Sequence, residues 1–388
     1  MSIQSEVKAK KILILTTISR TINAFLIPHI VDLVRNGYSV EIACNDVNQV
    51  DKILKDLNLR NYELPLSRNP FSLKNINALK KLNTILKNNQ YSIIHTHTPI
   101  ISAIVRLLAK RLKLSNIYYT AHGFHFYRGA PLKNWLIFYT IEKYLSRYTD
   151  TLITINKEDF ELAKKKFHSR RVLYIPGIGI DFTKFNNLNE IDSNIIGEIG
   201  ICNSNLNIFS IGEINKNKNH LVILKAIRKL NNDKIHYYIV GEGKNKVRLQ
   251  KVIKKYRINK QVHFLGFRKD IPNILQSADL FAFPSKREGL GLAAIEAIIS
   301  NVPLITSNIH GINDYSIDNV TSYKCNPNDY KCFAYHISKY LDDRSIKSRL
   351  ITWKESNIQK YSINNVIDIM RDIYINSQCK NDDKRGKI

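Results

Sequence analysis

The sequence predicts an α/β protein made of two domains, each a parallel sheet covered by helices. Short apolar segments alternate with amphipathic segments along most of the chain, which is typical of parallel strands joined by helices. The length of 388 residues suits two ordinary domains better than one. An Asn-rich stretch without clear periodicity, 181–205, interrupts the alternation near the middle.

The first half of the chain reads as seven short strands separated by helices. The predicted strands are 11–16, 38–44, 62–64, 91–95, 117–120, 151–155 and 172–175. The predicted helices are 24–36, 50–58, 72–88, 100–112, 135–148 and 157–167. Gly37 follows the first of these helices, as glycine commonly does at a helix C-terminus.

The second half repeats the pattern. Its predicted strands are 206–211, 236–240, 262–265, 280–283 and 303–306, and its predicted helices are 221–230, 244–256, 271–276, 292–300 and 330–341. An amphipathic segment at 363–375 precedes a charged tail at 380–388, which we expect to be frayed. We therefore expect an N-terminal domain over 1–182 and a second domain over 183–361. The C-terminal segment 362–388 is expected to pack back on the first domain.

Composition limits the functional classes. The chain has an odd number of scattered cysteines: Cys44, Cys202, Cys325, Cys332 and Cys379. No C-x-x-C pair occurs, so the sequence predicts neither a disulfide framework nor a zinc site, and it suits a reducing compartment. No apolar run reaches the roughly 18 residues of a membrane span. The apolar run after Lys11 is too short for a signal peptide.

The chain is strongly basic, with 59 Lys and Arg against 33 Asp and Glu and a net charge of +26. Three interpretations are open: a compositional bias that also enriches Lys, Asn and Ile, attraction to an anionic membrane surface, and nucleic-acid binding. The last is the weakest, since no R-G-G, zinc-finger or RNP-like motif occurs.

Residues 281–297 read F-A-F-P-S-K-R-E-G-L-G-L-A-A-I-E-A. A strand, a glycine-containing turn and a helix start form an anion site, because free backbone N–H groups and the helix dipole point at the ligand. Glu288 and Glu296 are eight positions apart, and eight helical residues rise about 12 Å. That span matches a nucleotide-diphosphate sugar. Glu296 would accept from ribose hydroxyls and Glu288 from hexose hydroxyls.

The amides of the turn would then hold the diphosphate between the two carboxylates. These amides belong to Gly289, Leu290, Gly291 and Leu292. The plainer alternative is that Glu288 caps the helix and Glu296 is a solvated helix residue. Against this, Glu296 lies among alanines and isoleucines, where an unpaired carboxylate is rare.

The spacing E-x7-E, after F-P-S and within E-G-x-G, resembles the signature of family-four retaining glycosyltransferases of the GT-B fold. The resemblance is to members of the bacterial capsule or exopolysaccharide type. It implies two Rossmann-like domains facing a central cleft, and it is most specific over 117–127 and 206–299.

The resemblance extends to loops at other strand ends. His122, in T-A-H-G-F, matches a His that lies against the donor sugar, and Lys218 matches a phosphate-binding Lys in G-R-x-x-x-x-K. Gly212 opens that loop, but Glu213 stands where the Arg is expected, and Lys216, Lys286 or Arg287 are candidates for the missing charge. The turns predicted to lie near the nucleotide base contain Gly241, Gly243, Gly266 and Phe267.

Two further features have competing interpretations. His95 and His97 form a metal-like H-x-H at a strand end, but no third ligand is evident, so a loop contact or a structural role is favoured. Residues 129–150 combine aromatic side chains with Lys133, Lys143 and Arg147. Core packing is the default for such a segment, and an interfacial, membrane-facing surface is the alternative.

Taken together, the resemblance implies transfer of a hexose or N-acetylhexosamine from a UDP-sugar to a saccharide, with retention at the anomeric carbon. The acceptor would be a saccharide or a polyprenyl-diphosphate-linked glycan, and neither a metal nor another cofactor is expected. The implied location is cytoplasmic, peripheral to the inner face of the plasma membrane, with no nucleic-acid partner. The alternatives are a GT-B sugar-nucleotide epimerase and a basic nucleic-acid-binding protein.

Overall fold

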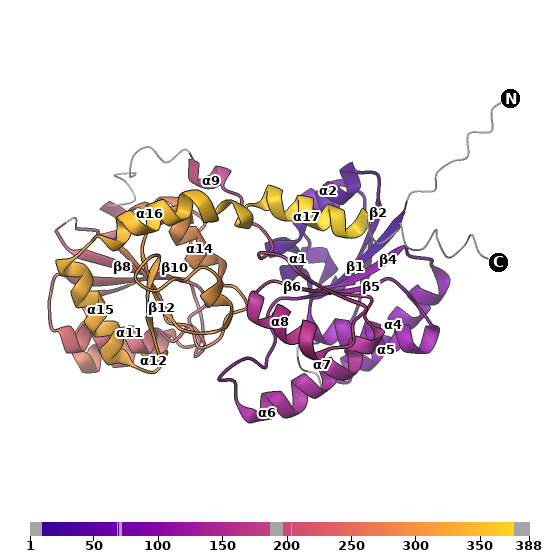
Figure 1. Cartoon of the computed structure of the whole chain (residues 1–388), viewed down its shortest axis with the longest axis horizontal. Coiled ribbons are helices and arrows are strands. Elements are labelled where there is room, and N and C mark those ends of the chain that lie inside the picture. The colour runs from indigo at the N-terminus through magenta and orange to yellow at the C-terminus, as the bar shows by residue number, and fades with distance from the viewer. Residues whose placement is uncertain (1–9, 68, 70–71, 187–196, 203, 376–388) are drawn as a thin grey trace. The chain divides into compact units, whose positions relative to one another are not determined.

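The computed structural model describes the chain except for residues 1–9, 68, 70–71, 187–196, 203 and 376–388 (Figure 1). The tail at 380–388, predicted to be frayed, lies outside the described residues. The chain divides into two compact units: unit 1 contains 1–179 and 363–388, and unit 2 contains 180–362. The sequence-based boundaries were 182/183 and 361/362.

Unit 1 is built on a seven-stranded parallel sheet in the order β3-β2-β1-β4-β5-β6-β7. Its strands are β1 (Lys11–Ile18), β2 (Ser39–Asn45), β3 (Arg60–Glu63), β4 (Ile93–Thr96), β5 (Ile117–Ala121), β6 (Thr151–Thr154) and β7 (Arg171–Tyr174). Its main helices are α1 (Ser19–Phe25), α2 (Ile27–Arg35), α3 (Lys52–Asp56), α4 (Lys74–Asn88), α5 (Pro99–Leu112), α6 (Leu132–Asn134), α7 (Thr140–Leu145), α8 (Lys157–Lys166) and α17 (Ile363–Ile375).

Helices cover both faces of this sheet because neighbouring strand residues point to opposite sides. Ile94 belongs to an apolar cluster with residues of α4 and α5. The next residue, His95, points the other way, and its Nδ1 lies 2.6 Å from the hydroxyl of Tyr374 on α17. Helix α17 lies beside α2 in Figure 1, where Arg371 pairs with Asp32 at 2.6 Å. The last helix therefore packs on the first unit.

Unit 2 is built on a six-stranded parallel sheet in the order β10-β9-β8-β11-β12-β13. Its strands are β8 (Leu206–Ile211), β9 (Ile235–Val240), β10 (Val262–Gly266), β11 (Leu280–Phe283), β12 (Leu304–Ser307) and β13 (Ser322–Cys325). Its helices include α9 (Thr183–Asn186), α11 (His220–Leu230), α12 (Lys246–Tyr256), α13 (Ile271–Gln276), α14 (Leu292–Ile299), α15 (Tyr330–Asp342) and α16 (Ile346–Asn357). Alternate strand residues such as Ile208 and Ile239 pack with α11, α12 and α15 in one apolar cluster.

Most predicted elements form, with specific differences. The predicted helix 24–36 starts earlier, at Ser19, and is interrupted at Leu26, two residues before Pro28. The predicted helix 135–148 contains a π-helical turn, Trp135–Tyr139, before α7. Strand β13 and helix α16 were not predicted. Residues 181–205 are not wholly irregular, because α9 and a helical turn at 197–199 lie within them.

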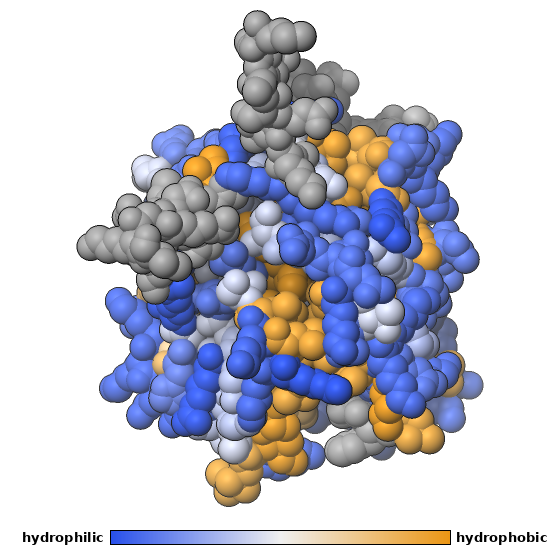
Figure 2. Space-filling model, turned by 90° about the vertical axis from the view of Figure 1, so that its right-hand side faces the viewer, coloured by the Kyte–Doolittle hydropathy of each residue, from blue (hydrophilic) through white to orange (hydrophobic). Residues whose placement is uncertain are grey.

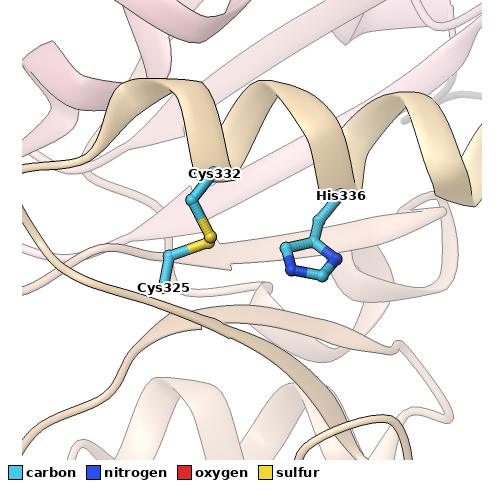
Figure 3. A group of neighbouring side chains, drawn as sticks. All are labelled: Cys325, Cys332 and His336. Atoms are coloured by element: carbon cyan, nitrogen blue, oxygen red, sulfur yellow. The ribbon is translucent and has the colours of Figure 1, made fainter.

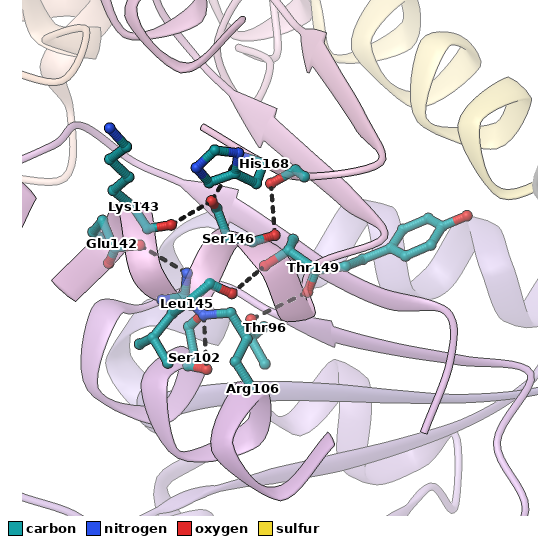
Figure 4. A network of polar contacts seen from close by, with 11 residues as sticks. Thr96, Ser102, Arg106, Glu142, Lys143, Leu145, Ser146, Thr149 and His168 are labelled. Carbon is teal, nitrogen blue, oxygen red and sulfur yellow. Dashed lines mark hydrogen bonds and ion pairs between the residues drawn. The ribbon is translucent and has the colours of Figure 1, made fainter. Parts of the chain in front are cut away.

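A buried ion pair fixes α7 to α5 (Figure 4). Arg106 Nη1 donates to Glu142 Oε2 at 2.8 Å, and the side chains are 1% and 10% exposed. Arg106 Nε also donates to the Ser102 carbonyl at 3.1 Å, and its guanidinium stacks 4.6 Å from the Tyr119 ring centre. Ser146, at the end of the same segment, accepts from the backbone of His168 at 2.8 Å. These polar contacts therefore hold segment 132–148 against α5 and His168.

Over the part of the chain that the structure describes, no helix combines the length and the apolar character needed to cross a membrane.

Candidate active site

The predicted donor-binding residues of unit 2 gather where its sheet reverses its strand order. Strands β8 and β11 lie side by side, with Ile208 paired to Leu280, although β9 and β10 separate them in sequence. The chain leaves these neighbouring strands toward opposite sides of the sheet. Ligands of open α/β sheets bind at the carboxyl ends of strands at such a point.

Glycines at the ends of β8, β9 and β10 let three loops stack backbone on backbone. The Gly241 amide donates to the Gly266 carbonyl at 2.7 Å, and the Gly212 amide to the Val240 carbonyl at 2.9 Å. Gly241 has φ +135°, and a Cβ there would lie 2.2 Å from the Gly212 carbonyl oxygen. Gly243 is equally enclosed, since a Cβ would lie 2.4 Å from the Ile214 oxygen. Only glycine fits at these positions, so the three loops pack against each other through their main chains.

Asparagines between Gly212 and α11 organise the loop that carries Lys218, a role that sequence reasoning missed. Asn215 Oδ1 accepts from the amides of Asn217 and Lys218, each at 2.9 Å. Asn217 Nδ2 donates to the Arg287 carbonyl at 2.8 Å. Asn219, at φ +56°, donates to the carbonyls of Pro284 at 3.0 Å and Pro327 at 2.7 Å. The repeated N-K-N-K-N was the available signal, because Asn hydrogen-bonds locally and tolerates left-handed backbone.

Lys218 and Glu288 meet directly. The Lys218 ammonium lies 2.7 Å from Glu288 Oε1, with side chains 20% and 14% exposed, and 4.5 Å from the Phe283 ring centre. Lys218 also packs over Gly212, where a Cβ would lie 2.9 Å from its Cε. The two residues assigned to phosphate and hexose therefore neutralise each other in the structure.

The turn before α14 has the expected shape, but its geometry corrects one argument. Gly291 is the N-cap of α14 at φ +87°, and a Cβ there would lie 2.5 Å from Phe283 Cε1. Leu292 begins the helix, and the buried Leu290 carbonyl accepts from Tyr315 Oη at 2.8 Å. Gly289 packs so closely on Gly311 that a Cβ on Gly311 would lie 1.8 Å from its oxygen. Glu288 precedes the helix, so a 12 Å helical rise from Glu288 to Glu296 is wrong.

Glu296 lies on α14 among buried residues of the same helix, including Ile295 and Ala297. Among the described residues, no hydrogen bond or ion pair reaches its carboxylate. Burial raises its pKa above the ordinary value of 4.5, and the more distant charge of Lys184 opposes that shift. A partly buried, unpaired carboxylate is suited to accept hydrogen bonds from a ligand's hydroxyl groups.

The remaining predicted residues of unit 2 lie at the surface. Phe267 follows β10 and is 72% exposed, next to Gly266 at φ +69°. Glu213 and Lys216 are exposed, and Arg287 is partly exposed. None of these side chains makes a described contact with Lys218. Which residue supplies the positive charge expected at the Glu213 position therefore stays a prediction.

In unit 1, His122 directly follows β5. Its Nε2 lies 3.4 Å from His97 Nδ1, and its ring stacks on Phe25 with centres 6.1 Å apart. Burial, and secondarily the charge of nearby His29, lowers the pKa of His122 to about 4. His122 is therefore a neutral imidazole near pH 7, suited to hydrogen bonding and not to charge neutralisation.

The H-x-H pair has a structural role on the His95 side. Nδ1 of His95 contacts Tyr374 and its Nε2 lies 2.8 Å from Thr120 Oγ1, so both ring nitrogens are engaged. Burial lowers the pKa of His95 to about 3. His97 is also buried, and its ring centre lies 4.1 Å from that of His95 and 5.6 Å from that of His122, so it lies between the two.

Only some of the large side chains in segment 129–150 pack in the core. Trp135 and Tyr139 pack on the buried Phe126, but other large apolar side chains point to solvent. These exposed side chains, named here the 132–144 apolar surface, are Leu132, Leu136, Ile137, Phe138, Ile141 and Tyr144, at 37–73% exposure. Figure 2 shows this side of unit 1, where an apolar strip reaches the lowest part, at the height of α6 and α7 in Figure 1. Contiguous exposed apolar side chains mark interaction sites.

Three residues that could ligate a metal lie together in unit 2, although the sequence pattern indicated no zinc site. Cys325, Cys332 and His336 come together at the edge of the unit 2 sheet (Figure 3). Their spacing, C-x6-C-x3-H, matches no common motif, so only the fold reveals the group.

Comparisons with known proteins agree with this architecture. Residues 11–156 match the family model "Glycosyl transferase 4-like", and residues 194–356 match "Glycosyl transferases group 1". EpsD of Bacillus subtilis strain 168, described as a candidate glycosyltransferase, is 30% identical over 371 residues, 94% of this chain and 96% of that protein. The Escherichia coli UDP-Gal:alpha-D-GlcNAc-diphosphoundecaprenol alpha-1,3-galactosyltransferase is 27% identical over 351 residues, 87% and 89% of the two chains.

Solved structures share the fold. Anabaena HepE in complex with UDP and glucose superposes with a TM-score of 0.76 at 15% identity, covering 94% of this chain and 99% of that one. Sucrose-phosphate synthase from Thermosynechococcus elongatus gives the same TM-score at 15% identity, covering 96% and 100%. With two Rossmann-like units, the matching family models and a relative similar over nearly its whole length, this chain belongs to the family-four glycosyltransferases of the GT-B fold.

Proposed function

We propose that this glycosyltransferase moves a hexose or N-acetylhexosamine from a UDP-sugar to a saccharide acceptor, with retention, in cell-surface polysaccharide synthesis. The observation that carries the proposal is the Lys218–Glu288 pair at the β8/β11 reversal, just before the start of α14. One cation and one carboxylate at this point suit a ligand with phosphates at one end and hydroxyls at the other.

The donor roles follow from the chemistry of each group. The amides of Gly289, Leu290, Gly291 and Leu292, with Lys218, would hold the diphosphate, since helix starts and ammonium groups bind phosphate. The unpaired carboxylate of Glu296 would accept from ribose hydroxyls. Gly212, Gly241, Gly243, Gly266 and the exposed ring of Phe267 would line the nucleotide. These groups would stabilise the leaving UDP without requiring a metal or another cofactor.

Glu288 and His122 would bind the transferred sugar. In the reaction, the bond between the anomeric carbon and the diphosphate oxygen would break, the acceptor hydroxyl oxygen would bond to that carbon, and the hydroxyl proton would pass to the leaving diphosphate. Catalysis would come from positioning and from stabilising the charge that develops on the diphosphate. No covalent nucleophile is assigned. The neutral state of His122 suits a hydrogen-bond donor to the sugar.

The acceptor is proposed to be a polyprenyl-diphosphate-linked glycan at the inner face of the plasma membrane. Two observations support this: the name of the E. coli relative includes a diphosphoundecaprenol acceptor, and the 132–144 apolar surface lies on a chain of net charge +26. Apolar side chains beside basic ones favour an anionic interface. Peripheral attachment of unit 1 would bring the enzyme to lipid-linked substrates.

The test is incubation with a panel of UDP-sugars and acceptors, reading UDP release and the transferred sugar. Transfer with the α-anomer preserved supports the proposal. An epimerase would instead convert the UDP-sugar without releasing UDP, and a nucleic-acid-binding protein would gain thermal stability from polynucleotide but not from UDP. Either result contradicts the proposed reaction.

A further inference from the structure

Cys325, Cys332 and His336 place three metal-ligating atoms within 4.8 Å of one another. Figure 3 shows the two cysteine side chains directed at each other from a strand and a helix, with the His336 ring below the same side of that helix. Cys325 is 2% exposed, and the other two are partly buried. The group lies in unit 2.

The local fold explains why these residues meet. Cys332 and His336 are four positions apart on α15, so they share one helix face. Cys325 ends β13, the edge strand that α15 covers. Asp329 caps α15 by accepting from the amides of Lys331 and Cys332 at 3.0 and 3.1 Å, which sets the start of the helix close to the strand end.

The ring of His336 is held in one orientation. It stacks on Tyr323, with centres 4.7 Å apart and planes at 14°. Its Nδ1 is buried, and it has no hydrogen-bond partner among the residues that the structure describes. In Figure 3 the other ring nitrogen, Nε2, lies on the side of the two cysteines. The fixed ring therefore presents an imidazole nitrogen to the two sulfurs, as in zinc sites built from cysteine and histidine.

We propose that Cys325, Cys332 and His336 form a zinc-type metal site, with a solvent molecule as the fourth ligand. Two sulfurs and one imidazole are soft or borderline donors that select zinc and related ions over magnesium or calcium. Ligand atoms around tetrahedral zinc lie about 3.6–3.8 Å apart, so three atoms already within 4.8 Å close on the ion with small movements.

The role of the metal is to fasten the last strand of the sheet to its covering helix. Both cysteines flank the connection 326–329, and Pro327 in that connection accepts the hydrogen bond from Asn219 at 2.7 Å. The backbone amide of Asn308 donates to the Cys325 carbonyl at 2.8 Å, which ties the same strand end to β12. Metal binding therefore stabilises a junction of three chain segments.

The test uses the full chain, reduced and stripped of metal with a chelator, then titrated with Co²⁺. One Co²⁺ per chain is expected, with thiolate-to-metal charge-transfer absorption and the visible bands of tetrahedral cobalt, and displacement by Zn²⁺. Cys332→Ser and His336→Asn should each weaken binding by at least about tenfold. Cys202→Ser, which changes an exposed cysteine, is the matched control and should leave the spectrum unchanged.

Thermal unfolding gives an independent readout. Zn²⁺ should raise the Tm of the stripped wild-type protein and of Cys202→Ser, but not of His336→Asn, with circular dichroism confirming that each variant is folded. A spectrum without charge transfer, or one that Cys332→Ser leaves intact, overturns the proposal. So does mass analysis of the protein as purified, before reduction, that finds Cys325 and Cys332 joined by a disulfide and no bound metal.

Discussion

The ammonium of Lys218 lies 2.7 Å from the carboxylate of Glu288, so the two predicted donor ligands are paired with each other. A diphosphate that recruits Lys218 must compete with this ion pair. Glu288→Ala should therefore bind UDP at least as tightly as the wild type, while sugar transfer collapses.

Lys218→Met should show the opposite pattern. A hydrogen bond to a charged group contributes roughly 1.5–3 kcal/mol, so UDP affinity should fall about tenfold or more. Calorimetric titration of UDP into both variants, together with transfer rates, separates the two roles. Loss of UDP binding in Glu288→Ala as severe as in Lys218→Met would show that the assignment of Glu288 to the sugar is wrong.

The ionised carboxylate of Glu296 should destabilise the folded protein near pH 7. Burial raises its pKa in the folded protein above 4.5, so folding favours the protonated form. The resulting contribution to stability is fully present below the pKa that Glu296 has in the unfolded chain. It is lost as the pH rises through the higher pKa that Glu296 has in the folded protein. Glu296→Gln should therefore have a higher Tm than the wild type near pH 7, and the difference should vanish below about pH 4.5. Glu355→Gln, on the exposed surface of α16, is the control.

Substitution of Glu296 should also change the affinity for the nucleotide. Glu296→Ala is expected to weaken UDP and UDP-sugar together by about tenfold, because the lost contact is to the shared ribose. A variant with altered Tm and unchanged affinity for both ligands would reduce Glu296 to a structural residue.

His122→Ala should lower turnover far more than UDP affinity, since His122 is placed on the sugar. Loss of one preorganised polar contact typically raises the barrier by about 2.7–4 kcal/mol. Because the pKa of His122 is lowered to about 4, its titration should leave no step near pH 6.5 in the kcat profile of the wild type. Steady-state kinetics over pH 5–8 with calorimetry of UDP checks both statements, and an unchanged kcat in folded His122→Ala would contradict the first.

Arg106 and Glu142 form the buried ion pair under the 132–144 apolar surface. Removing only one of these two residues should strongly lower the free energy of unfolding. Glu142→Ala leaves the Arg106 guanidinium buried without its carboxylate, and about 3–5 kcal/mol of unfolding free energy should be lost. Replacing both residues, as Arg106→Met with Glu142→Leu, should recover most of it. Urea unfolding measures each variant. Arg344→Met is the control, because the Arg344 side chain is 56% exposed in its pair with Asp279, and pairs at the surface are worth about 0–1 kcal/mol. Equal losses in the single and double variants would contradict this.

Association with anionic vesicles should depend on the 132–144 apolar surface and on salt. Leu136→Glu adds a charge where an apolar side chain is 66% exposed, and it should reduce co-sedimentation, whereas Ile53→Glu on α3 should not. Binding should weaken as salt shortens the Debye length to about 8 Å at physiological strength. Equal sedimentation with neutral and anionic vesicles at low salt would count against the membrane role.

The periodicity of apolar residues was sufficient to predict most of the helices and strands, but not those in which this pattern is weak. Strand β11 was predicted because its four residues are all apolar, and the structure shows all four to be buried. Strand β13 contains Lys324 and spans only four residues, and α16 buries only Ile346 and Leu350, so neither shows a readable stripe. Local propensity carries little information where packing decides the structure.

The site was predictable where a glycine or a charge stands at a strand end, as for Gly241, Lys218 and Glu288. What the sequence did not reveal is tertiary pairing. The contact of Lys218 with Glu288 spans 70 positions, and the bond from Asn219 to Pro327 spans 108. The grouping of Cys325 with His336 likewise depends on a strand that was not predicted.

Unit 1 is completed by α17, a helix that is synthesised after unit 2. Tyr374, which satisfies the buried His95, lies on α17, and Ile363 at its start follows Gly179 by 184 positions. At about 5–20 residues per second, translation reaches this helix roughly 10–40 s after the rest of unit 1. During that interval unit 2 can fold, while the face of the first sheet around His95 lacks its cover. The N-terminal unit of this enzyme therefore reaches its final form only after its C-terminal unit has been made.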